Sequence, residues 1–448
     1  MPPFPFLALP LELRESIYSL YFKPADRLHC NDSLNEKGFF GGVYDFDFDL
    51  YRVNRQVYSE AQGVWRRENV FVKIATPWPS AGMYRVYLMS EEGREWSDED
   101  GVGLANHVAS KGLVPIVCTD QRADLFSTHH ALVQITVPFQ QAIPEHTVVV
   151  LLDDLHLFTQ TWYYSTLSYP MLNHRLSTTF VLRNPSTPTT LQRRLLLPFE
   201  KIKGLHHMQV SGYEPSIHKE LQRLMAVPLP SLTQCCDEAA DLMDQGDIAL
   251  SRNDPEEALD LYIDSFRAIH ILIHQRTRHV LAGAFFHASI SSGRFAGQAG
   301  ITVRVILRLK LVARCVLAYL KLSQLAEAAF WGSRSIRIMR ESMDVGFEDV
   351  LSESMGGEHV GLIYVRTGVA VWMLERQKAE GGDDGGYEGE GSERIWSLAT
   401  KFLRGKRKEE IRKELRDFGV PAEVVGLFGD SEGETSSSLT AHGSGDEE

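Results

Sequence analysis

The sequence predicts an α+β fold in which N-terminal helices are followed by a mixed α/β middle layer and an all-α C-terminal region. Apolar residues at helical spacing dominate residues 1–75, and short β-branched or aromatic runs dominate residues 76–228. Helical periodicity takes over from residue 229 to 425. A Gly- and acid-rich insertion at 380–393 interrupts this region, and a low-complexity acidic tail at 426–448 ends it. Neither segment can bury enough apolar area to offset the entropy of ordering, so both are expected to be solvated loops.

The first 75 residues predict two helices and a strand. The helices are expected at about 10–22 and 50–67, and the strand at 70–74. Each helix carries an apolar stripe that must pack on another surface. The stripes consist of Leu13, Ile17 and Leu20 in the first helix and of Val53, Val57, Ala61 and Val64 in the second.

The middle region predicts several short strands whose order the sequence leaves open. Two segments between them, 153–169 and 191–203, are expected to be helical. The strands are expected at 84–89, 113–118, 132–137, 147–152, 178–183 and 207–211.

Charge excludes one class of partner. The net charge is −13, and residues 380–393 and 430–448 together hold twelve acidic residues and no Lys or Arg, which leaves −1 for the rest. A nearly neutral body offers no long-range attraction to a phosphate backbone, so nucleic acid is not expected as a partner.

Cysteine use and hydropathy indicate a compartment. The five cysteines are scattered without a CxxC pair, which excludes a disulfide scaffold and a zinc ribbon. The most apolar helix-like stretch, 301–322, is broken by Arg304, Arg308, Lys310 and Arg314, so no membrane span is expected. The proline-rich N-terminus has no basic residue before Arg14, unlike a signal peptide. A reducing compartment, cytoplasmic or nuclear, fits these features.

The N-terminal region resembles a known domain. The run Leu9-Pro10-Leu11-Glu12-Leu13-Arg14, followed by Ile17, Tyr18 and Leu20, is similar to the opening of an F-box. It is closer to the F-box-like E-x-R domains that are abundant in filamentous fungi, because NRQVYSEA at 54–61 and NVF at 69–71 are similar to that family's R-Q-[IV]-Y-x-E-A helix and N-x-F strand.

The F-box-like resemblance implies a docking role. In F-box proteins part of such a surface docks on the Skp-type adaptor of a cullin ubiquitin ligase. The implied partner-binding residues are Leu9, Pro10, Leu13 and Ile17. The alternative is that these residues only seat the first helix against residues 53–64. Four charges, Glu12, Arg14, Arg55 and Glu60, are expected to form an ion-pair network between the two helices rather than a catalytic site.

The C-terminal region resembles tetratricopeptide (TPR) repeats. Gly246, Ala258 and Tyr262 have the repeat's spacing, and small residues at the first two positions are needed where the helices cross. A weaker copy contains Ala328, about two periods of roughly 34 residues after Ala258, so a further helical pair is expected at about 268–298. A generic helical bundle is the alternative interpretation.

TPR arrays bind peptides in a concave groove, so this second resemblance implies a scaffold or adaptor. One subclass holds chaperone C-terminal carboxylates with a Lys/Asn clamp. Met243 and Asp247 stand at the clamp positions here, so such a ligand would meet a like charge and is not expected to bind.

Motifs for nucleotide binding, zinc proteolysis or serine hydrolysis are missing from the sequence. The best enzyme candidate is Asp153, Asp154 and His156 after the strand at 147–152, as a cryptic hydrolase or metal site, although a helix cap explains the same residues. We therefore expect a non-enzymatic protein-interaction adaptor with no catalytic residue, cofactor or metal. Its partners are expected to be proteins, with a Skp-type adaptor and a client as the candidates, and the chain is expected to be a monomer outside its complex. A ligase-independent scaffold is the alternative.

Overall fold

The computed structural model describes residues 5–31, 33–34, 39, 41–77, 114–138, 146–169, 171–274, 276–341, 357–381, 387, 389–403 and 408–429. The chain divides into two compact units. The N-terminal unit consists of residues 1–230 and 281–285, and the C-terminal unit of residues 231–280 and 286–448. The strand expected at 84–89 and residues 430–448 of the expected tail lie outside the described residues.

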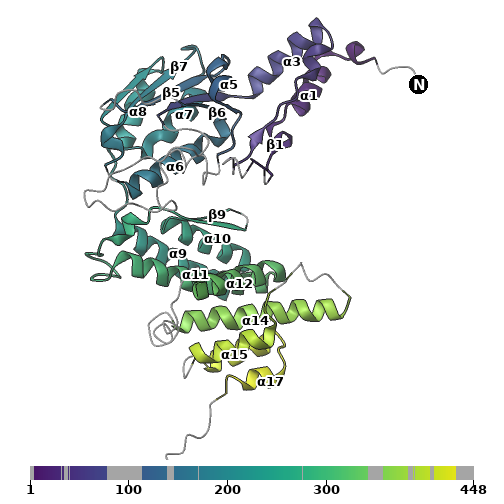
Figure 1. The fold of residues 1–448 in the computed structure, drawn as a ribbon, viewed down its shortest axis with the longest axis vertical. Helices are drawn as coiled ribbons and strands as arrows, with labels where there is room; N and C mark the ends of the chain where they lie inside the picture. Colours follow the sequence, from purple (N-terminus) through teal and green to yellow (C-terminus); the bar gives the residue numbers. More distant parts are fainter. Residues whose placement is uncertain are drawn as a thin grey trace, which may run out of the picture. The chain divides into compact units, whose positions relative to one another are not determined.

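The N-terminal unit is a mixed α/β structure built on a six-stranded sheet (Figure 1). Its strands are β1 Leu28–His29, β2 Val43–Tyr44, β3 Phe71–Thr76, β4 Cys118–Thr119, β5 Ala131–Thr136, β6 His146–Leu151, β7 Ser177–Leu182 and β8 His207–Ser211. Its α-helices are α1 Leu11–Tyr21, α3 Arg55–Glu68, α5 Asp120–Leu125, α6 Leu155–Ser168, α7 Thr189–Leu196 and α8 Pro215–Ala226. The sheet has the order β4-β6-β3-β5-β7-β8, and β1 pairs separately with β2.

Strand β3 lies inside the sheet and is buried along nearly its whole length. Val72 faces Val150 of β6 in an antiparallel pair and Ala131 of β5 in a parallel pair. Such near-continuous burial is typical of a strand whose two faces are both covered. Further along, β7 runs antiparallel to β5 and parallel to β8. The mixed α/β fold expected for the middle region is thus confirmed.

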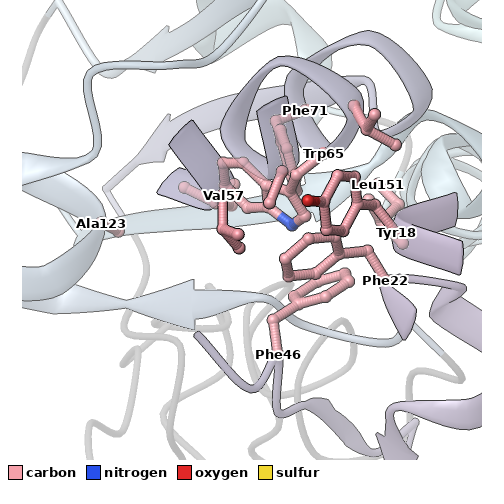
Figure 2. Close-up of a cluster of buried hydrophobic side chains, with 11 residues drawn as sticks. Tyr18, Phe22, Phe46, Val57, Trp65, Phe71, Ala123 and Leu151 are labelled. Atoms are coloured by element: carbon pink, nitrogen blue, oxygen red, sulfur yellow. The ribbon is translucent and has the colours of Figure 1, made fainter. Parts of the chain in front are cut away.

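A cluster of buried aromatic side chains joins the N-terminal helices to the sheet (Figure 2). The ring of Trp65 on α3 lies 4.9 Å from that of Phe71 on β3, measured between centroids. Tyr18 and Phe22 of α1 are buried in the same cluster, and β6 contributes Leu151. The domain boundary expected at residue 75 falls inside β3, and the N-terminal helices share this core with the sheet.

The structure of the N-terminal unit differs in two details from what the sequence predicts. Helix α3 begins at Arg55 rather than at residue 50, because the Asn54 side chain caps it by accepting the Val57 N–H at 2.9 Å. Val53 therefore precedes the helix and is 62% exposed, although it was expected in the buried stripe. In the described part of the strand expected at 113–118, only Cys118 belongs to a strand.

In the part of the chain that the structure describes, the C-terminal unit consists mainly of helices, with one β-hairpin (Figure 1). Its elements are α9 Leu232–Ser251, α10 Pro255–Ala268, β9 Ile271–His274, β10 Thr277–Val280, α11 Gly300–Lys321, α12 Leu325–Glu341, α14 Gly357–Ala379, α15 Ser392–Phe402, α16 Lys408–Asp417 and α17 Ala422–Gly426. Helices α9 and α10, α11 and α12, and α14 and α15 pack pairwise, and α10 and α12 contact the following pair. The helical C-terminal region is confirmed at this level.

At two helix crossings in this unit the helices lie so close together that only glycine fits. A Cβ added to Gly246 of α9 would lie 2.7 Å from Cδ1 of Tyr262 on α10, and one added to Gly368 of α14 would lie 2.6 Å from Cδ1 of Trp396 on α15. Both distances are far inside van der Waals contact, and both rings are fully buried. The small residue expected at Gly246 is therefore required by Tyr262.

An ion pair between a buried arginine and a half-buried glutamate ties α16 to α14. The guanidinium of Arg366 donates to both carboxylate oxygens of Glu414 at 2.7 and 2.9 Å, and its third nitrogen donates to the Ala313 carbonyl of α11 at 2.7 Å. Arg366 is 8% exposed. The Arg366 side chain therefore joins three helices, α11, α14 and α16, although Glu414 lies 48 residues after it in the chain.

Three expectations for the C-terminal unit are wrong. Residues 268–298 contain β9 and β10 instead of a helical pair. Val305 of α11 is spaced to share an inward face with Leu309, Val312, Val316 and Leu320, yet it is 38% exposed. The described end of the insertion at 380–393 is not a free loop, because Glu390 accepts two N–H groups from Arg340 of α12 at 2.9 and 3.2 Å.

Candidate functional site

Helix α1 is held to the core by one polar side chain that the sequence placed in an ion-pair network. Arg14 is 7% exposed and donates to both oxygens of Glu60 on α3, at 2.9 and 2.7 Å. It also donates to the carbonyls of Leu7 and Leu9, which precede the helix. The Arg14 guanidinium holds the pKa of Glu60 down at about 2. Glu12 and Arg55, expected in the same network, are exposed.

The opposite face of α1 is apolar and exposed. Leu13 is 52% exposed, Ile17 41% and Leu20 70%. At 100° per residue these three share one face, while Arg14 and Tyr18 point into the core. The stripe that the sequence predicted is therefore present, but it does not seat α1 against α3.

The four predicted partner-binding residues divide between the helix and the turn before it. Leu13 and Ile17 lie on the exposed face of α1, Pro10 is the exposed N-cap residue, and Leu9 is half-buried. Sequence periodicity missed Leu7 and Leu11, which are 46% and 44% exposed and add to the apolar surface around the helix start. The 3-10 turn at Phe6–Ala8 places Leu7 there.

Acid should weaken the attachment of α1 through Glu60. Because its pKa falls from 4.5 to about 2 on folding, its contribution to stability is complete above pH 4.5 and is lost as the pH drops toward 2. We expect the melting temperature of Glu60→Gln to be lower than that of the wild type at pH 6, with the difference narrowing as the pH approaches 2. Glu12→Gln, which removes an exposed carboxylate of α1, is the control and should follow the wild type. A difference that stays constant with pH would contradict this assignment.

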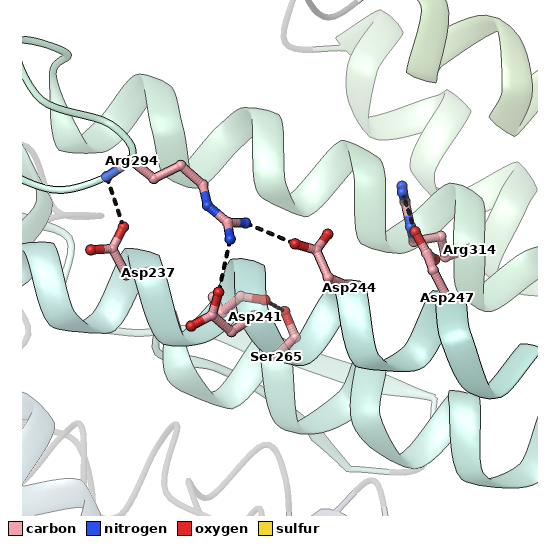
Figure 3. A network of polar contacts seen from close by, with 8 residues as sticks. Asp237, Asp241, Asp244, Asp247, Ser265, Arg294 and Arg314 are labelled. Atoms are coloured by element: carbon pink, nitrogen blue, oxygen red, sulfur yellow. Dashed lines mark hydrogen bonds and ion pairs between the residues drawn. The ribbon is translucent and has the colours of Figure 1, made fainter.

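A second candidate surface lies on α9 of the C-terminal unit. Asp237, Asp241 and Asp244 occupy one face of this helix at spacings of four and three residues. Figure 3 shows Arg294 crossing this face: its guanidinium donates to Asp241 at 2.8 Å and to Asp244 at 3.0 Å, and its backbone N–H donates to Asp237 at 3.3 Å. The acidic face is thus already covered by a loop of the same unit.

Asp247 continues the row of acids on α9 but has a different partner. Arg314 of α11 donates to both of its oxygens at 2.7 Å (Figure 3). The Tyr262 hydroxyl also donates to it, at 2.8 Å. The residue that replaces the clamp asparagine therefore joins α9, α10 and α11. Met243, which stands at the other clamp position, is buried. These contacts give both residues a packing role.

The residues proposed as a remote enzyme candidate have structural partners. The Asp153 side chain is 82% exposed and pairs with Arg194 at 2.7 Å. Asp154 stands at the N-cap of α6 but makes no capping hydrogen bond; it accepts the Tyr44 hydroxyl at 2.9 Å instead. His156 is exposed and contacts the Asp153 carbonyl at 2.7 Å. Across the described residues, no group of three His, Cys, Asp or Glu side chains is placed to hold a metal ion.

The vicinal cysteines are buried inside α9 as free thiols. Burial raises the pKa of Cys235 to about 12 and that of Cys236 to about 11. The thiolate is the reactive form, so both side chains act as small apolar residues in the helix packing. Their burial within α9 agrees with a role in helix packing.

Fold and geometry thus define a two-unit protein, with an exposed apolar helix on a mixed α/β unit and paired helices in the other. Comparison with protein-family models, curated proteins and solved structures gave no match to the chain. Of the helices in the described ranges, none has the length and hydropathy needed to cross a membrane.

Proposed function

We propose that the chain is a non-enzymatic protein-interaction adaptor of the F-box-like type, whose helix α1 docks a Skp-type adaptor of a cullin ubiquitin ligase. The observation that carries the proposal is the exposure of Leu13, Ile17 and Leu20 on a helix whose other face is firmly anchored. Leu9 and Pro10 extend this surface at the helix start.

Anchoring makes the exposed stripe suited to docking. Arg14 and Tyr18 both reach Glu60, at 2.7 Å for the guanidinium and 3.1 Å for the hydroxyl, and Phe22 is 1% exposed. A helix fixed in this way presents its apolar side chains without an ordering cost on binding. Contiguous exposed apolar side chains on a folded domain mark interaction sites.

The C-terminal unit supports a client-binding role within the same proposal. Its paired helices, with Gly246 under Tyr262 and Ala258 fully buried, have the small-residue crossings of TPR-like hairpins. Repeats of this kind expose extended binding surfaces. A ligase-independent scaffold would use the same unit without the α1 contact.

The test is affinity purification of the tagged full-length chain from the organism that encodes it. We expect a Skp-type adaptor and a cullin with the wild type, and at least a tenfold loss of both with Leu13→Asp plus Ile17→Asp. The melting temperature of this variant should stay near that of the wild type, because both side chains are exposed.

Leu125→Asp is the matched control, since Leu125 is 83% exposed on α5 of the same unit and should leave capture unchanged. Failure of the wild type to capture a Skp-type adaptor would contradict the ligase role and favour the scaffold. Unfolding of the double variant would show that Leu13 and Ile17 belong to the core.

A further inference from the structure

The described end of the acidic insertion forms a short strap made of Tyr387, Gly389 and Glu390. The Tyr387 hydroxyl donates to the Glu390 carbonyl at 3.1 Å, which folds the side chain back along its own backbone. A Cβ added to Gly389 would lie 2.9 Å from Cε2 of the same ring, so a larger residue there would push the ring away. Tyr387 is also the only large apolar residue between positions 380 and 393. The strap therefore has a defined shape, although it has little apolar surface to bury.

Polar contacts join the strap to α12. Because the Tyr387 proton goes to the Glu390 carbonyl, the Ser333 hydroxyl is the donor in its 3.0 Å contact with the Tyr387 oxygen. Arg340 donates to both carboxylate oxygens of Glu390, at 2.9 and 3.2 Å, and holds the pKa of this carboxyl below its usual range. The exposed Arg394 lies further away, at 3.4 Å from the same carboxylate. Hydrogen bonds of this kind exchange readily for equivalent ones with water or another chain, so the strap can be displaced.

The α12 side of this contact is preformed. The guanidinium carbon of Arg340 lies 5.8 Å from the centroid of the Tyr364 ring on α14, within the range of a cation–π interaction. Tyr364 is 2% exposed, and its ring stacks on that of Phe402 of α15 with 5.3 Å between centroids. None of these contacts involves the strap, so they hold Arg340 in place whether or not Glu390 is bound. A preorganised helix surface that holds a short acidic segment by its side chains has the arrangement of a receptor with a bound peptide.

We propose that Ser333 and Arg340 of α12 form a binding site for an acidic, tyrosine-containing segment of a protein partner, and that the strap occupies this site as an internal competitor. The strap itself selects the ligand, because its tyrosine oxygen and its glutamate carboxylate are the groups that the site holds. The inference rests on the client-binding role proposed for the C-terminal unit and adds the chemistry of the client segment. The site differs in place from a TPR clamp, whose positions Met243 and Asp247 lie on α9 and are engaged in packing.

The experiment titrates the purified full-length chain into a fluorescently labelled peptide with the sequence of residues 386–392, Gly-Tyr-Glu-Gly-Glu-Gly-Ser, and follows fluorescence anisotropy. We expect the wild type to bind this peptide weakly, because its own strap fills the site. Tyr387→Phe with Glu390→Gln removes the hydroxyl and the charge of the strap, so this opened variant should bind the peptide at least tenfold more tightly. Adding Arg340→Met to the opened variant should abolish binding, and a peptide with the same Phe and Gln changes should not bind.

Glu380→Gln is the matched control, because Glu380 belongs to the same insertion but pairs with the exposed Arg376, and this variant should bind like the wild type. Equal binding by the opened variant and the wild type would overturn the proposal, as would binding that survives Arg340→Met. Unfolding of the opened variant would also overturn it, since a displaceable segment cannot be required for the fold. The titration contains no ligase component, so its failure leaves the role of α1 untouched, whereas failure to capture a Skp-type adaptor leaves this site untouched.

Discussion

Replacing Trp396 by alanine should lower the free energy of unfolding of the C-terminal unit by about 3–5 kcal/mol, the usual cost of removing a buried tryptophan. The indole is 1% exposed and covers Gly368 of α14, and its Nε1 donates to the Val365 carbonyl at 3.2 Å. Its loss opens a cavity and leaves that carbonyl without its donor. Urea titration followed by far-UV circular dichroism measures the effect.

The control is Ile248→Ala, which truncates a side chain that is 58% exposed on α9 and should change stability by no more than about 0.5 kcal/mol. Gly368→Ala tests the same crossing from the other helix, and overpacking there should cost about 1–3 kcal/mol. If Trp396→Ala cost no more than Ile248→Ala, the α14–α15 crossing would not be the tight contact described above.

Replacing Glu414 by glutamine should cost about 3 kcal/mol, because it leaves the Arg366 guanidinium buried and without its anion. The pair is bidentate, and only 10% of the Arg366 side chain is accessible. The loss of stability should fall on the packing of α16, since Glu414 lies on that helix and pairs with Arg366 of α14. Thermal or urea unfolding of the full-length chain provides the measurement.

Helix α16 itself offers the matched control. Glu409→Gln removes a carboxylate that is 72% exposed and pairs with Arg412 and Arg416, and exposed pairs contribute about 0–1 kcal/mol. A double variant, Arg366→Met with Glu414→Leu, removes both charges. It should recover much of the free energy of unfolding that Glu414→Gln loses. Equal effects of Glu414→Gln and Glu409→Gln would refute the buried-pair assignment.

The spacing of apolar residues predicted the strands of the N-terminal unit well. It did not predict which side chains of α1 are buried. The strands at 132–137, 147–152, 178–183 and 207–211 were found within one residue or so of their expected bounds. The apolar stripe of α1 was expected to need a packing partner, yet the core takes Tyr18 and the charged Arg14 instead. Arg14 can be buried only because Glu60, 46 residues later, reaches it, and spacing within one helix contains no such information.

The helical pair that the repeat spacing predicts at 268–298 is not what the structure contains there. The distance between Ala258 and Ala328 left room for a helical pair, but Ile271 and Ile273 flank Leu272 in a β-prone run that forms β9. Lengths between repeats cannot distinguish two helices from a hairpin followed by a loop.

The attachment of α1 has a consequence for synthesis on the ribosome. Its anchors come from Glu60 and from a cluster that includes Val149 and Leu151 of β6, more than 120 residues after the helix ends. Because the chain emerges from its N-terminus, α1 leaves the exit tunnel long before the strand that completes its seat. A nascent or truncated chain ending before β6 would carry α1 with its partner Glu60 but without Val149 and Leu151, so the cluster beneath the helix would be incomplete. The seat of α1 is therefore completed only when β6 joins the sheet.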